Sequence, residues 1–125
     1  MSKPTVAILG ASNDRTKYGN KAVRAYQRQG YDVYPVNPRL DQIEGLTAYP
    51  TLDSVPVERL DRISVYLPPP VTEQLLPQMA AKGCEELWLN PGSATAAIAE
   101  RARSLGLPVI EACSIVDIGE IPDAD

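Results

Sequence analysis

Short apolar runs alternate with helix-like segments along this chain, and this alternation restricts the fold more than any other feature. The runs are continuous and rich in β-branched residues, which is typical of strands buried on both faces of a sheet. Five such runs of strand length are present: Thr5–Leu9, Asp32–Val36, Ile63–Leu67, Glu86–Leu89 and Val109–Ala112. A sheet made of these strands needs helices above and below it, because neither face can remain in water.

The segments between the runs are each followed by the glycine that is typical of a helix end. Asn20–Gln29, Val71–Lys82 and Ser93–Leu105 are the candidate helices, and a glycine follows each one directly. Glycine is favoured just past a helix because it adopts the left-handed conformation without strain. Strand, helix, glycine and strand in this order predict an α/β fold: a Rossmann-like, doubly wound, mostly parallel sheet of about five strands with helices on both faces. The 125 residues predict one domain, with an ordered core over about residues 4–119 and a tail over 120–125.

Three local features bear on the boundaries of these elements. Ser93 is expected to cap the last helix, since a serine hydroxyl accepts hydrogen bonds from the free amides of a first turn. Pro77 lacks an N–H and crowds the preceding turn, so the middle helix is expected to start late or to kink there. The stretch Asp41–Arg59 is the least regular part of the chain and predicts a loop with one short strand at Thr47–Tyr49.

Composition argues against several classes of function. The formal charge of −4 gives no electrostatic support for binding nucleic acid or an anionic membrane. No apolar run reaches the roughly 18 residues of a membrane span, and the first residues lack the apolar core of a signal peptide. Cys84 and Cys113 have neither metal-ligand spacing nor a disulfide framework, so a cytoplasmic location and no metal site are expected. Histidine, the commonest general base, is absent.

Ligands of doubly wound sheets bind beyond the carboxyl ends of the strands, so the loops at these ends are the candidate site. After the first strand, Gly10 allows a tight turn, and Ser12 and Asn13 offer side-chain donors. The helix that begins near Gly19–Asn20 directs free amides and the positive end of its dipole toward the same place. We therefore predict a phosphate site in this loop. A plain strand-to-helix turn, with Lys17 as a solvated surface charge, is the alternative.

The loop after the second strand distinguishes among nucleotide ligands. NAD sites have the pattern G-x-G-x-x-G and an acidic residue that holds the adenosine ribose. Here the first loop reads Gly10-Ala11-Ser12, and Asn37-Pro38-Arg39 stands in place of the acid. A guanidinium binds phosphate through two parallel hydrogen bonds, so Arg39 favours a ribose that carries a phosphate, as in NADP or coenzyme A. A surface arginine beside Asp41 is the alternative.

Two further loops complete the candidate site. Pro68, Pro69 and Pro70 follow a buried strand and present apolar surface and carbonyls but no N–H groups, which suits a flat base or a thin pantetheine chain. A rigid connection from strand to helix explains the same prolines equally well. Asn90-Pro91-Gly92 follows the next strand, and Asn90 is expected to hydrogen-bond either an amide of the ligand or its own turn.

The order of the pieces "VAILGASND…KYG", "VYPVNP", "VYLPPP", "WLNPG" and "VIEACS" resembles the small CoA-binding domain family. Over about residues 5–119 the chain is similar to the CoA-binding domain of the succinyl-CoA synthetase alpha subunit. The resemblance implies a Rossmann-like fold and coenzyme A or an acyl-CoA as the ligand. The chain departs from that subunit in lacking the ligase half and a phosphorylatable histidine, and it has Asn90-Pro91-Gly92 in place of a Thr-Glu-Gly run.

The resemblance also implies which loop meets which part of the ligand. In the first loop, the residues that would hold the phosphates are Gly10, Ala11 and Ser12, with Lys17 and Tyr18. The residues that would meet the adenosine and its ribose phosphate are Asn37, Pro38 and Arg39. The path of the adenine and pantetheine would be lined by Leu67, Pro68 and Pro69, and the pantetheine arm would meet Asn90, Pro91 and Gly92.

Three functions remain open at this point. The first is a non-catalytic module that binds coenzyme A or an acyl-CoA as a sensor or carrier, with an unknown protein partner and an oligomer possible. The second is a redox or regulatory protein that binds NADP. The third is an enzyme acting on a CoA thioester or thiol, for which Cys113 is the candidate nucleophile at this edge. We find no acid–base pair beside it and therefore assign no catalytic residue.

Overall fold

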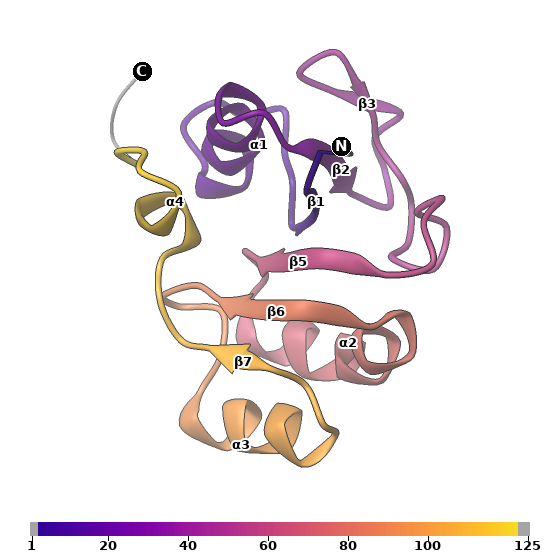
Figure 1. Cartoon of the computed structure of the whole chain (residues 1–125), viewed down its shortest axis with the longest axis vertical. Helices are drawn as coiled ribbons and strands as arrows, with labels where there is room; N and C mark the ends of the chain where they lie inside the picture. Colours follow the sequence, from indigo (N-terminus) through magenta and orange to yellow (C-terminus); the bar gives the residue numbers. More distant parts are fainter. Residues whose placement is uncertain (1–2, 123–125) are drawn as a thin grey trace.

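A five-stranded sheet with the strand order β2-β1-β5-β6-β7 forms the centre of the molecule in the computed structural model, which describes residues 3–122 (Figure 1). Its strands are β1 (Thr5–Leu9), β2 (Asp32–Val36), β5 (Leu60–Val65), β6 (Cys84–Leu89) and β7 (Val109–Ile110). Every neighbouring pair is parallel. The chain places β2 on one side of β1 and β5 on the other, so the strand order reverses between β1 and β5. The predicted fold class is confirmed.

Helices cover both faces of this sheet (Figure 1). They are α1 (Tyr18–Arg28), α2 (Pro69–Lys82), α3 (Ala96–Ser104) and the short α4 (Ser114–Asp117). α1 and α4 pack on one face, and α2 and α3 pack on the other. Gly30, Gly83 and Gly106 have positive φ angles just past the ends of α1, α2 and α3, as their positions in the sequence predict.

Two apolar clusters fill the layers, one on each side of the sheet. Successive side chains of a strand point to opposite faces. In β1, Ala7 and Leu9 accordingly join the cluster beneath α2 and α3, while Val6 and Ile8 join the cluster beneath α1 and α4. Burial of β1 on both faces places its carboxyl end, and Gly10 beyond it, at the centre of one edge of the molecule.

All three helix starts differ from the sequence prediction, and α1 begins at Tyr18, two residues before the expected Asn20. α2 begins at Pro69 and continues through Pro77, so the late start expected from Pro77 is wrong. A first turn leaves its amides unpaired in any case, so prolines are tolerated there. α3 begins later than expected, because the Thr95 hydroxyl, and not Ser93, accepts from the Ile98 amide at 3.2 Å. Ser93 Oγ instead donates to the Asn90 carbonyl at 2.7 Å.

The segment between β2 and β5 contains a hairpin that the sequence analysis missed. β3 (Gln42–Ile43) and β4 (Leu46–Thr47) pair in antiparallel fashion around a two-residue turn, so the expected strand at Thr47–Tyr49 is wrong. Tyr49 instead bridges to Val36 at the edge of the main sheet. The turn residues Glu44 and Gly45 both have positive φ angles, 49° and 79°, which is the geometry of a type I′ hairpin.

Candidate functional site

Three adjoining cavities form a groove at the edge where β1, β5 and β6 end. We name them the Leu52 cavity, the central cavity and the Cys113 cavity, and their volumes are about 500, 470 and 360 Å³. Tyr66, directly after β5, lines all three. The groove therefore crosses the position where the strand order reverses, which is where ligands bind in folds of this type.

Two glycines bring the loop after β1 against its surroundings. Gly10 has a φ of 88°, and a Cβ there would lie 2.6 Å from the backbone oxygen of Tyr66. A Cβ on Gly19 would collide with the backbone oxygen of Gly10. The start of α1 therefore lies directly on the end of β1, which is the close packing that the third glycine of a dinucleotide motif provides. Gly10 and Gly19 are further apart in the sequence than the glycines of a dinucleotide motif, so the loop between them is longer.

Free main-chain amides gather in this loop and at the start of α1. Ala11, Ser12 and Asn13 have amides without an acceptor within residues 3–122, and so do Tyr18 and Gly19 in the first turn of α1. Lys17 occupies the cap position of α1, and its side chain makes no capping hydrogen bond. Free amides and the positive end of a helix dipole together attract an anion. Lys17 and Tyr18 also line the central cavity.

The Leu52 cavity is mainly apolar and includes residues that the sequence analysis did not identify. One face of α2 lines it through Val71, Leu75 and Gln78, and the loop of residues 50–52 lines the opposite side. The intervals of four and three between the α2 residues are the spacing of one helix face, so this signal was available in the sequence. The loop gives no comparable signal, because its position depends on the hairpin before it.

The loop after β2 lies beside the Leu52 cavity. Asn37 and Pro38 line the cavity, while Arg39 is exposed beyond its lining. Asn37 Nδ2 donates to the Ala11 carbonyl at 2.9 Å, and its Oδ1 accepts from the Arg39 amide at 2.8 Å. The Arg39 guanidinium is exposed and has no hydrogen-bond or ion-pair partner within residues 3–122, so both the phosphate contact and a plain surface arginine remain open for it.

Two further candidate side chains are used within the protein, as that of Asn37 is. Asn13 lies outside the lining of the cavities, and its amide donates to the Gln42 carbonyl at 3.1 Å. Asn90 is buried and donates to Ser64 Oγ at 2.9 Å and to the Val65 carbonyl at 3.0 Å, while its Oδ1 accepts from the Ser114 amide at 2.9 Å. Asn90 therefore joins β5, β6 and α4, and its amide group is occupied.

The other candidates lie in or next to the groove. Leu67 and Pro68 line both the Leu52 cavity and the central cavity, and Pro91 and Gly92 line the central cavity. Pro69 is the first residue of α2 and does not line any of the three cavities. Pro68 and Pro91 carry no backbone N–H, so this part of the groove has fewer hydrogen-bond donors than the part formed by the loop after β1 and the start of α1.

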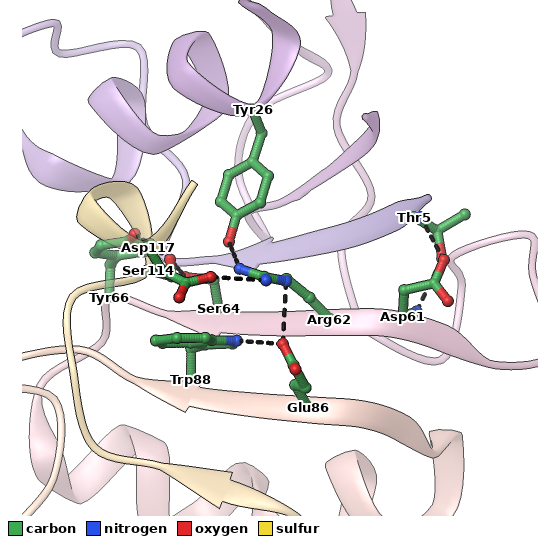
Figure 2. A network of polar contacts seen from close by, with 10 residues as sticks. All are labelled: Thr5, Tyr26, Asp61, Arg62, Ser64, Tyr66, Glu86, Trp88, Ser114 and Asp117. Carbon is green, nitrogen blue, oxygen red and sulfur yellow. Dashed lines mark hydrogen bonds and ion pairs between the residues drawn. The ribbon is translucent and has the colours of Figure 1, made fainter. Parts of the chain in front are cut away.

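A polar network continues from the groove under α4 (Figure 2). The Tyr66 hydroxyl lies 3.1 Å from Ser114 Oγ, which lies 2.7 Å from Ser64 Oγ. Burial raises the pKa of Tyr66 far above its ordinary value, so its hydroxyl stays protonated at neutral pH. Tyr66 therefore serves as a neutral hydrogen-bonding group at the floor of the groove.

The same network holds an arginine between the sheet and the helices. Arg62 of β5 pairs with Asp117 of α4 at 2.8 Å and with Glu86 of β6 at 3.1 Å, and Figure 2 shows Tyr26 of α1 directed at its guanidinium. The arginine also lies over the Trp88 ring, 5.0 Å from the ring centroid. These contacts attach α4 to the sheet and so fix the segment that lines the Cys113 cavity.

The two cysteines lie at opposite ends of the sheet. Cys84 is buried at the start of β6, and burial raises its pKa to about 11. Cys113 is partly exposed and lines the cavity named after it, together with Tyr18, Val116 and Pro122. Across residues 3–122, no three acidic, cysteine or histidine side chains gather as a metal ion requires. Among these residues, no helix combines the length and the apolar character of a membrane span.

Comparison with known proteins identifies the class. The family model described as "CoA binding domain" matches residues 4–119, so the chain belongs to this family. The resemblance to a CoA-binding domain of the succinyl-CoA synthetase type is thereby confirmed.

Particular relatives agree with this assignment. The alpha subunit of an ADP-forming acetate–CoA ligase II from Pyrococcus furiosus is 34% identical over 79 residues, which cover 62% of this chain and 17% of that protein. A conserved hypothetical protein from Pyrococcus furiosus superposes with a TM-score of 0.81 at 29% identity, covering 93% of this chain and 99% of that one. A dinucleotide-forming acetyl-CoA synthetase from Ca. Korarchaeum cryptofilum, solved with phosphate and ADP, gives a TM-score of 0.75 at 25% identity, covering 86% of this chain and 25% of that one. The chain thus spans less than a fifth of the length of the curated ligase subunit.

Proposed function

We propose that this protein binds coenzyme A or an acyl-CoA as a non-catalytic sensor or carrier module. The observation that carries the proposal is the continuous groove: an apolar cavity at one end, free amides in the middle and a narrower cavity at the other end. Coenzyme A has the same order of parts, with a flat base, a diphosphate and a long thin arm that ends in a thiol. Membership of the CoA-binding family supports this assignment.

Each part of the ligand has a chemically matching position in the groove. The adenine fits the Leu52 cavity, between the face of α2 and residues 50–52. The diphosphate fits the free amides after β1 and at the start of α1. The pantetheine arm fits the central cavity, along Leu67, Pro68 and Pro91, and its thiol reaches the Cys113 cavity. Pro68 and Pro91 present no N–H groups, so the arm passes over apolar surface.

Arg39 supports coenzyme A over ligands without a ribose phosphate. Arg39 directly follows Pro38, which lines the cavity proposed for adenine, and the Arg39 guanidinium has no partner within residues 3–122. A bidentate contact with the 3′-phosphate of coenzyme A would give the Arg39 guanidinium a partner. NADP also carries a ribose phosphate and is the competing ligand. Its nicotinamide half would have to fill the groove that the pantetheine arm fits.

An enzyme acting on a CoA thioester or thiol is the other competing function. Cys113 lines the end of the groove, but no carboxylate or lysine lines that cavity with it to act as a base. Binding without chemistry is therefore the function we propose, in a cytoplasmic setting.

Three measurements test the proposal. Native mass spectrometry of freshly purified protein is expected to show a co-purifying mass of coenzyme A or an acyl-CoA, and calorimetry is expected to give tighter binding of CoA than of NADP. Tighter binding of NADP would replace the proposal with the second function. Turnover with a panel of acyl-CoA thioesters, lost in Cys113→Ser, would replace it with the third.

A further inference from the structure

Side chains from outside the loop after β1 hold its carbonyl groups. Asn37 Nδ2 donates to the Ala11 carbonyl at 2.9 Å, and Asn20 Nδ2 donates to the Ser12 carbonyl at 2.8 Å. A trans peptide carries its C=O and the following N–H on opposite sides. The amides of Ser12 and Asn13 are therefore turned away from the two asparagines. Both of these amides lack an acceptor within residues 3–122.

Asn20 is fully buried, and its own orientation is fixed by two charged residues. Its amide group also donates to Glu44 Oε2 at 3.0 Å, and its Oδ1 accepts from Arg24 Nε at 2.8 Å. A carboxylate only accepts and a guanidinium only donates. Glu44 and Arg24 together therefore determine which end of the Asn20 amide faces the Ser12 carbonyl.

Glu44 occupies a position where its backbone is strained. It is the one residue other than glycine with a positive φ within residues 3–122, at 49°, in the first position of a type I′ turn. Glycine, asparagine and aspartate are the residues that suit this position. Strain at a residue whose side chain makes a specific, partly buried contact points to a role for that contact.

We propose that Asn20 and Glu44 are positioning residues of the anion site: they orient the peptide plane between Ser12 and Asn13 so that the loop presents the Asn13 amide to a diphosphate. The inference rests on the proposed function, since the diphosphate is that of coenzyme A. Neither residue lines the groove, so neither touches the ligand. Their effect is transmitted through the Ser12 carbonyl.

Glu44→Gly separates this role from a contribution to stability. Glycine suits the turn, so the melting temperature is expected to stay the same or rise. Loss of the carboxylate frees the Asn20 amide, and the affinity for CoA and for ADP is expected to fall ~10-fold, as for one lost hydrogen bond to a charged group. Adenosine has no phosphate, so its affinity, followed by amide NMR titration, is expected to stay the same.

Glu44→Gln is the matched control, because its side-chain oxygen still accepts from Asn20 and its affinities are expected to stay within about twofold of wild type. ADP is expected to shift the Asn13 amide signal in wild type and in Glu44→Gln, and to shift it less in Glu44→Gly. Unchanged ADP affinity in Glu44→Gly, or equal losses for ADP and adenosine, would overturn the inference. Wild-type protein that binds ADP but not CoA would overturn the proposed function alone, and protein that binds neither would overturn both.

Discussion

At the scale of single residues, Arg39 is the residue that we expect to distinguish ligands that differ by one phosphate. Arg39→Ala would remove the proposed bidentate contact, worth about 2 kcal/mol, so CoA binding is expected to weaken roughly 30-fold while 3′-dephospho-CoA binding is unchanged. Calorimetry with both ligands measures the difference. Arg59 is the matched control, since its guanidinium pairs with Glu85 next to Cys84, at the opposite end of the strands. Equal losses for the two ligands would show that Arg39 does not contact the phosphate.

Gly19 makes a second prediction at this scale. A methyl group there meets the backbone oxygen of Gly10, and neither backbone can move without displacing β1 or α1. Gly19→Ala is therefore expected to lower the free energy of unfolding by about 2–4 kcal/mol, as measured by urea denaturation. Gly30→Ala is the comparison, because a Cβ at Gly30 meets nothing within 4 Å. Its cost is backbone strain alone, about 1 kcal/mol. Similar losses for the two variants would contradict the close contact.

At the scale of elements, α2 contains a residue that weakens it. Pro77 lies inside α2 and removes one backbone hydrogen bond from the helix, yet its side chain is exposed. Pro77→Ala is expected to raise the free energy of unfolding by about 1 kcal/mol, less than the full cost of a helical proline because the unfolded chain becomes more flexible. Urea denaturation tests this change. CoA affinity is expected to stay the same, since Pro77 does not line the groove. A less stable variant would show that α2 is shaped around the proline.

The helix ends were predictable from neighbouring residues, but the start of α3 was not. The glycines after the helices were identified correctly because helix ends depend on neighbouring residues. The start of α3 was placed too early because Ser93 and Thr95 are both capping residues, and the choice depends on the turn that Asn90 makes after β6.

For the whole molecule, stability is expected to fall in alkaline solution. Burial raises the pKa of Tyr26, Tyr34 and Tyr66 above 10, and it raises the pKa of Cys84 to about 11 from 9.0. Each group stays protonated in the folded chain while the unfolded chain loses its proton. The stabilising contribution of these four groups is therefore fully present below pH 9, and it is lost as the pH rises through and above 10. Urea midpoints between pH 8 and pH 11 measure this decline.

Tyr66→Phe isolates one contribution to this decline. The variant loses the hydrogen bond to Ser114, at a cost of about 1 kcal/mol at pH 8. It no longer has a buried phenol to ionise, so its stability is expected to fall less steeply than that of wild type at high pH. Parallel declines in the two proteins would show that Tyr66 does not resist ionisation in the folded state.

The sequence by itself determined the class of fold and indicated the loops where the candidate site lies. Buried strands, helix-ending glycines and the turn at Gly10 are predicted from neighbouring residues, and the alternation of strands with helices predicts a parallel sheet with right-handed crossovers. The Gly10 loop, Leu67, Pro68 and Pro91 were therefore identified without coordinates, and the structure brings them to one groove.

Only the tertiary structure decided which polar side chains remain available to a ligand. Asn37 and Ala11 are 26 positions apart, and Asn90 and Ser114 are 24 apart, yet each pair shares a hydrogen bond that removes an asparagine group from the candidates. The proposed role of Glu44 was also evident only from the tertiary structure, because it depends on a hairpin that folds back onto α1. Hydrogen-bond partners of this kind are set by the packing of distant segments, and spacing along the chain carries no record of them.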